Sequence, residues 1–136
     1  MPDEKSFKLE IITPERDFFS GECESLVVTT VNGEMGILAD SLPLAAILAD
    51  GGIRIRQKNK WMKAFTGTGF IKVNKSGASV LVRSAEWPYE IKESDAEEDI
   101  GRLKEQLKKK QSVKEYKMAK AELARQLARL RVKKDI

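Results

Sequence analysis

Residues 80–103 read VLVRSAEWPYEIKESDAEEDIGRL, and the period of the hydrophobic pattern changes within this stretch. Before Pro88 apolar residues alternate with polar ones, as they do at Phe7, Leu9 and Ile11. After Pro88 they recur every three or four residues, at Ala96, Ile100, Leu103 and Leu107. A period of two indicates strands, and a period near 3.6 indicates amphipathic helices. The sequence therefore predicts an α+β protein with a β domain over 1–87 and a helical part over 88–136.

The excess positive charge follows the same boundary. Residues 1–87 carry eleven Lys or Arg and eleven Asp or Glu, whereas residues 88–136 carry fourteen and ten. The whole net charge of +4 therefore belongs to the helical part. Two interpretations stay open, a solvated helix face with solubilising charges and a docking surface for an acidic partner.

Length and composition limit the possible classes of protein. A chain of 136 residues can hold one compact domain and a small appendage. The longest apolar run, around residues 44–49, is too short to cross a bilayer, and no signal-peptide pattern begins the chain. Cys23 is the single cysteine, which excludes an internal disulfide and favours a reducing compartment. We interpret its side chain as a small hydrophobe rather than a reactive thiol.

The chain contains no histidine, which removes the commonest general base and the commonest transition-metal ligand. With one cysteine as well, the chain cannot assemble a zinc site. We therefore expect no enzyme, no metal and no cofactor. A small hydrolase with a carboxylate dyad stays as a weak alternative, because most carboxylates stand beside Lys or Arg in exposed-looking segments.

Short strands separated by turn residues fill the first part of the chain. The most β-branched run, Ser25 to Val31, is followed by Asn32-Gly33, which is a strong hairpin signal. Residues 44–48 are ambiguous by period. Closely spaced short strands are typical of a sandwich or a flattened barrel. Gly67-Thr68-Gly69 lacks the third glycine and the following helix of a dinucleotide fingerprint.

The second part of the chain carries two predicted helix starts. Ser94 with Glu97, and Ser112 with Glu115, both fit the capping-box spacing. A few residues around Gln111 separate the two helices, so we expect an antiparallel hairpin. Two helices alone bury too little apolar surface to offset the entropy of ordering them. We therefore expect the helical arm to be stable only when it is docked.

Four segments, in this order along the chain, resemble motifs of a known family. They are Thr13-Pro14-Glu15 with Phe19 and Gly21, residues 33–38 with Pro43-Leu44, residues 67–73, and residues 120–124 with 128–132. Together they resemble the ε subunit of F-type ATP synthases, which is called δ in mitochondria. The resemblance covers essentially the whole chain.

The resemblance implies a ten-stranded β-sandwich followed by the helical hairpin. It also implies a non-catalytic rotor subunit of the central stalk that binds the γ subunit and the c-ring. Such a subunit couples ion flow through the c-ring to ATP synthesis, and its C-terminal helices can reach the α/β catalytic head and inhibit hydrolysis. The implied location is peripheral, on the cytoplasmic face of a bacterial plasma membrane, with membrane association only through the complex.

The resemblance also implies two groups of site residues. Those facing the c-ring would be Gly33, Glu34, Met35, Gly36, Ser41 and Pro43. Those of the arm that contact γ and the head would be Arg125, Arg129 and Arg131. The family usually has a histidine where Ser41 stands, so a contact that depends on an imidazole is not expected here.

A nucleic-acid-binding module is the alternative of a different class, with the basic hairpin placed on phosphates. Against it, the strands lack aromatics interleaved with basic residues, and the helices carry alanines suited to helix packing. DNA binding that depends on salt, without affinity for γ, would favour this alternative.

The family's ATP-binding motif is degenerate in this chain. Where some bacterial members carry Asp and Arg, the chain has Lys92 and Asp95, so both charges are reversed. Glu86, Arg125 and Arg129 match positions that assist that site. We predict weak or no ATP binding, and isothermal titration of the isolated chain tests this. A micromolar dissociation constant would contradict the prediction.

Overall fold

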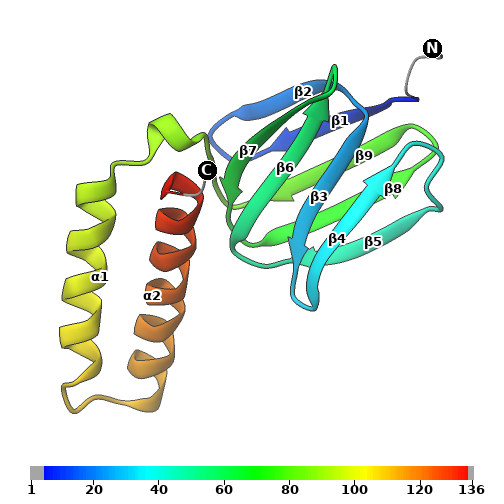
Figure 1. Cartoon of the computed structure of the whole chain (residues 1–136). Coiled ribbons are helices and arrows are strands. Elements are labelled where there is room, and N and C mark those ends of the chain that lie inside the picture. Colours follow the sequence, from blue (N-terminus) through cyan, green and yellow to red (C-terminus); the bar gives the residue numbers. More distant parts are fainter. Residues whose placement is uncertain (1–4, 135–136) are drawn as a thin grey trace.

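The computed structural model describes residues 5–134 and places a β-sandwich before a two-helix arm (Figure 1). The strands are β1 (Phe7–Ile12), β2 (Asp17–Cys23), β3 (Ser25–Thr30), β4 (Gly33–Leu38), β5 (Leu44–Leu48), β6 (Gly51–Gln57), β7 (Lys60–Thr66), β8 (Gly69–Asn74), β9 (Gly77–Val82) and β10 (Ala85–Glu86). A 3₁₀ turn η1 (Pro88–Glu90) then leads to α1 (Glu93–Leu107) and α2 (Val113–Lys134). The predicted α+β class is confirmed, and so are the ten strands that the resemblance implied.

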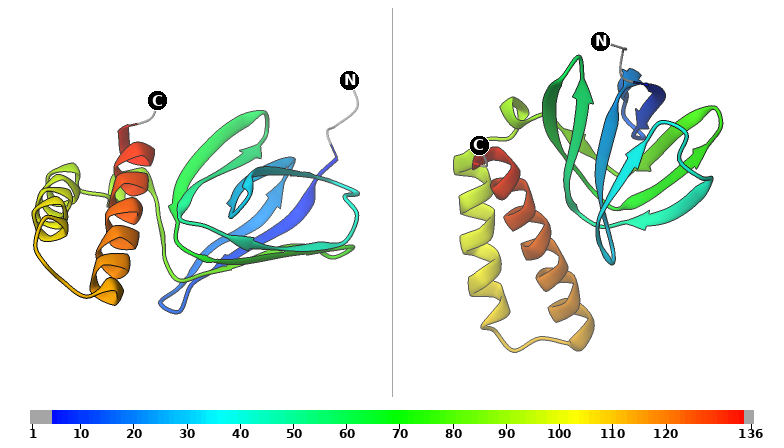
Figure 2. Two further views of the ribbon diagram at one scale, coloured as in Figure 1. Left: turned by 90° about the horizontal axis from the view of Figure 1, so that it is seen from below. Right: turned by 45° about the vertical axis from the view of Figure 1, so that its right-hand side comes forward.

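One folded-over sheet forms both layers of the sandwich (Figure 2). Its strand order is β10-β7-β6-β3-β5-β8-β9-β1-β2, and β4 joins it by pairing with β3. All pairs are antiparallel except β1 with β9, where Leu9 lies opposite Ala78. The first strand therefore lies between β9 and β2, one place from the end of the sheet order.

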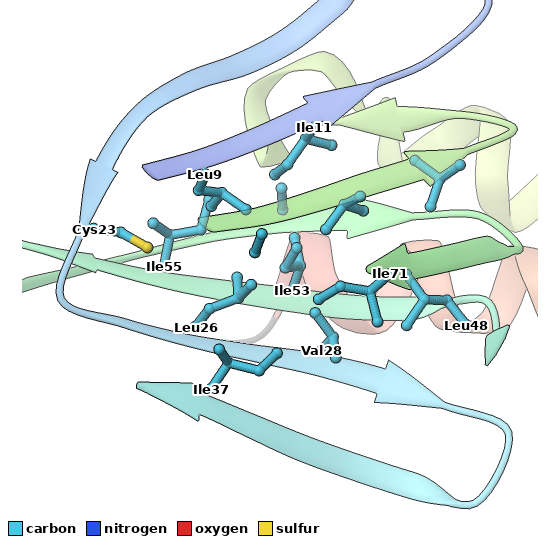
Figure 3. Packing of buried hydrophobic residues seen from close by; sticks show 14 of the residues in the cluster. Leu9, Ile11, Cys23, Leu26, Val28, Ile37, Leu48, Ile53, Ile55 and Ile71 are labelled. Atoms are coloured by element: carbon cyan, nitrogen blue, oxygen red, sulfur yellow. The ribbon is translucent and has the colours of Figure 1, made fainter. Parts of the chain in front are cut away.

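Alternation along the strands builds the main hydrophobic core (Figure 3). Leu9 and Ile11 on β1, and Ile53 and Ile55 on β6, are fully buried because every second side chain points into the sandwich. All seventeen members of this cluster precede β10 or lie on it. The sandwich therefore has a hydrophobic core to which the arm contributes no buried residue.

Several local predictions for the β part can now be compared with the structure. The hairpin at Asn32-Gly33 is confirmed, and Gly33 adopts a φ of 116° that favours glycine. Residues 44–48, ambiguous by period, form β5. We did not predict β10, because a strand of two residues is too short to show a period.

The second predicted capping box is confirmed and the first is wrong. Ser112 Oγ accepts the Glu115 amide at 3.1 Å, and Glu115 Oε1 accepts the Ser112 amide at 3.4 Å. α1, in contrast, begins at Glu93 with Lys92 as its N-cap residue, and the Ala96 amide already donates to the Lys92 carbonyl. Ser94 therefore lies inside the first turn and does not cap the helix. The acidic side chains of Glu93 and Asp95 in this turn interact favourably with the positive end of the helix dipole.

Candidate functional site

The arm docks on the sandwich through α2, which packs against β6, β7 and η1. Phe65 on β7 is covered by Ala128 and Val132 of α2 and by Ile91, and these four residues form an interface cluster separate from the main core. Small side chains allow α2 to approach closely, since a Cβ added at Gly52 would lie 3.4 Å from Val132. The apolar part of the docking interface is therefore small.

A bidentate ion pair is the main polar contact of this interface. Arg129 Nε and Nη2 each lie 2.7 Å from a carboxylate oxygen of Glu86. The side chains are only 16% and 21% exposed, so water screens the pair weakly. Hydrogen bonding to Glu86 raises the pKa of Arg129, so this guanidinium remains charged.

Gln126 extends the ion pair into a network. This residue is buried on α2, and its amide oxygen accepts from Arg129 Nη1 at 2.7 Å. Its amide nitrogen donates to Glu122 Oε1 at 2.8 Å, so both ends of the side chain have partners. These bonds lie within α2 and orient the Arg129 guanidinium, whose bonds to Glu86 cross to the sandwich.

The segment between the sandwich and α1 is held separately. Glu90 accepts from Arg16 Nη2 at 2.7 Å and from the Trp87 amide at 2.8 Å. The hydrogen bond from Arg16 lowers the pKa of the Glu90 carboxyl. The Trp87 ring stacks on Phe18 with centroids 4.4 Å apart. The start of the helical part is thus anchored to the β1–β2 turn and to β2 by contacts that do not involve α2.

The three predicted arginines of the arm have different surroundings. Arg125 lies over the Phe65 ring at 5.8 Å and lines a cleft of about 490 Å³ together with Asp50. Burial raises the pKa of Asp50, and the nearby Arg125 charge partly opposes this. Arg129 is engaged with Glu86, whereas Arg131 is exposed. The structure therefore brings two of the three to the docking interface.

Lys92 and Asp95, the two positions of reversed charge, lie at the start of α1 and are both exposed. Arg129 matches an assisting position of the family's ATP site, but here its guanidinium forms an ion pair with Glu86. Cys23 is buried, and burial raises the pKa of its thiol to about 12, in keeping with a structural hydrophobe.

The predicted c-ring-facing residues are distributed along β4 and the loop after it. Gly33 begins β4 at the hairpin turn, Glu34 pairs with Arg54 at 3.4 Å, and Ser41 lies beyond the opposite end of the strand. The Ser41 hydroxyl donates to the Leu38 carbonyl at 2.6 Å and accepts from the Leu38 amide at 3.1 Å. In this chain Ser41 therefore closes a local turn. Met35, Gly36 and Pro43 complete the predicted set, of which four members lie on β4 and two lie in the loop that follows it.

One surface feature was not predicted. Ile47, Phe70 and Leu81 lie directly opposite one another on β5, β8 and β9, with exposed fractions of 65%, 48% and 38%. Ile12 on β1 continues the row opposite Leu81. We call these four residues the apolar row. The signal in the sequence was an apolar residue at an outward position of each strand, where alternation calls for a polar one.

Residues 5–134 contain no cluster of three or more acidic or cysteine side chains arranged to hold a metal ion. Neither helix in this range is both long and apolar enough to cross a membrane.

A β-sandwich with a docked helical arm, each with its own apolar cluster, is the class of protein that this geometry defines. The family described as "ATP synthase, Delta/Epsilon chain, beta-sandwich domain" matches residues 6–88. Two proteins called ATP synthase epsilon chain are each 40% identical to this chain. The match to the one from Caldanaerobacter subterraneus subsp. tengcongensis covers 95% of this chain and 94% of that protein. The match to the one from Ruminiclostridium cellulolyticum covers 92% of this chain and 93% of that protein. The chain belongs to the ATP synthase delta/epsilon family, which confirms the resemblance found in its motifs.

Solved structures share the fold at low sequence identity. A chain in the Euglena gracilis mitochondrial ATP synthase structure, titled "OSCP/F1/c-ring in rotational state 1", superposes with a TM-score of 0.81 at 16% identity, covering 94% of this chain and 86% of that one. A chain in the Tetrahymena thermophila "central stalk/cring" structure gives 0.67 at 12% identity, covering 97% and 99%. At such identities the likeness concerns the fold alone.

Replacing Glu86 with Gln should loosen the docked arm, because Arg129 then keeps its half-buried charge without a carboxylate. Hydrogen bonds to charged groups contribute about 1.5–3 kcal/mol each. We expect amide hydrogen exchange in α2 to be about tenfold faster or more, with exchange in the sandwich unchanged. Glu98→Gln, at an exposed position of α1, is the matched control. Equal exchange in the two variants would contradict the role given to the ion pair.

Proposed function

We propose that the chain is a central-stalk rotor subunit of an F-type ATP synthase, coupling ion translocation through the c-ring to ATP synthesis in the catalytic head. The names of its relatives and the titles of the structures that share its fold support this proposal. The bacterial relatives support a peripheral location on the cytoplasmic face of the plasma membrane, with attachment only through the complex.

The β-sandwich is the proposed torque-transmitting part, and we propose residues 1–87 as a domain that folds on its own. The observation that carries this proposal is the self-contained main core, all of whose members lie between Leu9 and Ala85. Close-packed interiors have low compressibility and transmit strain. A rigid sandwich of this kind can stay bound to the γ subunit whatever position the arm takes.

We propose that the apolar row docks the γ subunit. Its three most exposed side chains cross three neighbouring strands at one level, so they form a continuous patch rather than scattered residues. Contiguous apolar patches on a protein surface mark interaction sites more often than isolated side chains do. Phe70, in the middle strand of the three, is the proposed anchor.

Phe70→Ser should weaken binding to the cognate γ subunit by at least tenfold, because it removes the largest apolar contact of the row. Lys72→Ser is the control, since Lys72 lies on the same strand and the same outward face of the sheet. The measurement is the dissociation constant for γ, together with the thermal midpoint of the free chain. If both variants bind γ equally well, the apolar row is not the γ surface.

The arm is the proposed regulatory part, over residues 88–136. We propose that it leaves the sandwich, extends along γ and inhibits ATP hydrolysis in the α/β head through Arg125, Arg129 and Arg131. The docked arrangement supports a competition, since Arg125 and Arg129 contact the sandwich and cannot serve the head at the same time. The small interface cluster and its polar network make exchange between the two positions feasible.

Truncation after Ile91 tests the two parts together. This variant keeps Trp87 and Glu90, which contact the sandwich, and removes both helices. We expect it to unfold cooperatively, to assemble with γ and the c-ring, and to support ATP synthesis while hydrolysis by the complex rises. Unchanged hydrolysis would remove the inhibitory role and leave the stalk role intact, whereas failure of the full-length chain to assemble would contradict the stalk role.

A further inference from the structure

The turn between α1 and α2 concentrates positive charge at one end of the arm. Residues 108–120, which we call the lysine tip, hold six lysines and one acidic residue, Glu115. The six lysines, all exposed, are Lys108, Lys109, Lys110, Lys114, Lys117 and Lys120. The lysine tip therefore has a larger excess of positive charge than the whole chain, whose net charge is +4.

Most of this charge is available to a partner. Among residues 5–134, no ion pair and no side-chain hydrogen bond involves the ammonium groups of Lys109, Lys110, Lys114 and Lys117. Lys108 pairs with Glu105 at 3.2 Å, but both side chains are exposed, so this pair contributes little. The carboxylate of Glu115 accepts from the Ser112 hydroxyl at 2.9 Å and belongs to the capping box of α2.

Apolar side chains are exposed beside these lysines. Val113 is 71% exposed and Met118 is 64% exposed, and the ring of Tyr116 is exposed as well. Val113 and Tyr116 line an open hollow of about 380 Å³ together with Lys109 and Lys110. Basic side chains next to exposed aliphatic and aromatic ones are typical of contact with an anionic bilayer, because the apolar groups can lie at the level of the headgroups.

The type of basic residue favours a bilayer over other anionic partners. The sequence has no arginine between Arg102 and Arg125. Guanidinium groups bind carboxylates and nucleic-acid phosphates through two parallel hydrogen bonds, whereas the lysine ammonium is a point charge on a flexible stem. Lysines without arginine therefore fit a diffuse anionic surface better than a defined set of carboxylates. Clusters of about four to eight basic residues on a helix are typical of binding to anionic lipids.

The docked arm directs the lysine tip to the side of the molecule that carries a predicted membrane-facing turn. Figure 1 shows the tip at the lower end of the arm, clear of the sandwich, and the turn between β3 and β4 at the lower end of the sandwich. Gly33 and Glu34 at that turn belong to the predicted c-ring-facing set. Since the c-ring lies in the membrane, a chain seated on it through this turn would direct the docked arm toward the bilayer. This placement rests on the proposed stalk function.

We propose that the lysine tip binds the phosphate groups of anionic phospholipids at the membrane surface, with Val113 and Tyr116 at the level of the headgroups. Salt screens such a contact, so it does not attach the chain by itself and acts where the complex already holds the chain near the bilayer. Lipid binding by the tip would favour the docked position of the arm and oppose its extension toward the catalytic head.

Vesicle sedimentation of the full chain at low ionic strength tests the lipid contact. The wild-type chain should bind vesicles of phosphatidylcholine and phosphatidylglycerol in equal amounts, but not vesicles of phosphatidylcholine alone. A variant that replaces four lysines of the tip with glutamine should bind the anionic vesicles about tenfold more weakly or less. Its substitutions are Lys109→Gln, Lys110→Gln, Lys114→Gln and Lys117→Gln. The matched control removes the same charge from four exposed lysines of the sandwich, through Lys58→Gln, Lys60→Gln, Lys72→Gln and Lys75→Gln.

Two outcomes of the sedimentation experiment would overturn the proposal. They are no binding of the wild-type chain to the anionic vesicles, and an equal loss of binding in the tip variant and the sandwich control. Polyglutamate and duplex DNA are tested at the same ionic strength as probes for the other anionic partners. Binding to either of them without binding to the anionic vesicles would also overturn the proposal. Because neither γ nor the c-ring is present, these results do not depend on the stalk function, which the assembly of the full-length chain tests separately.

Discussion

The contact between Glu86 and Arg129 joins the two parts of this chain, and the behaviour of the arm depends on it. Glu86 lies on the last strand of the sandwich and Arg129 lies on α2, 43 positions further along the chain. Removing two charges from water costs free energy that their attraction only partly returns, so such a pair adds more to specificity than to net stability. The interface cluster beside it has only four residues. The docked state is therefore well defined in geometry and modest in strength.

The same balance supports the different roles that we propose for the sandwich and the arm. The sandwich buries seventeen residues in a core of its own, whereas the arm has little apolar surface against it. An element held mainly by a polar network can leave without exposing a large apolar surface. The anchor formed by Arg16, Glu90 and the stacked Trp87 meanwhile keeps the start of the arm in place. The arm movement proposed above would thereby involve only the residues that follow η1.

The sequence predicted those features that depend on local patterns. The change of period at Pro88, the hairpin at Asn32-Gly33 and the capping box at Ser112 each involve residues close together in the chain, and each is confirmed. The box at Ser94 failed because acidic residues in the first turn allowed α1 to begin earlier.

Features that depend on long-range pairing could not be predicted from patterns. The apolar row exists because the register of β5, β8 and β9 aligns three side chains. The contact of Glu86 with Arg129 needs the docked position of α2, and the local role of Ser41 needs the turn after β4. Family motifs identified several of these residues, but they did not reveal which neighbours each one has.

The parallel pairing of β1 with β9 bears on the order of events during synthesis. Leu9 pairs with Ala78, 69 positions further along the chain, so β1 leaves the ribosome well before its partner β9. Chains emerge at about 5–20 residues per second, which leaves β1 without this neighbour for several seconds. Once β9 and β10 have been synthesised, the sandwich can close. The helices follow in the chain, so α2 can dock on a sandwich surface that is already complete.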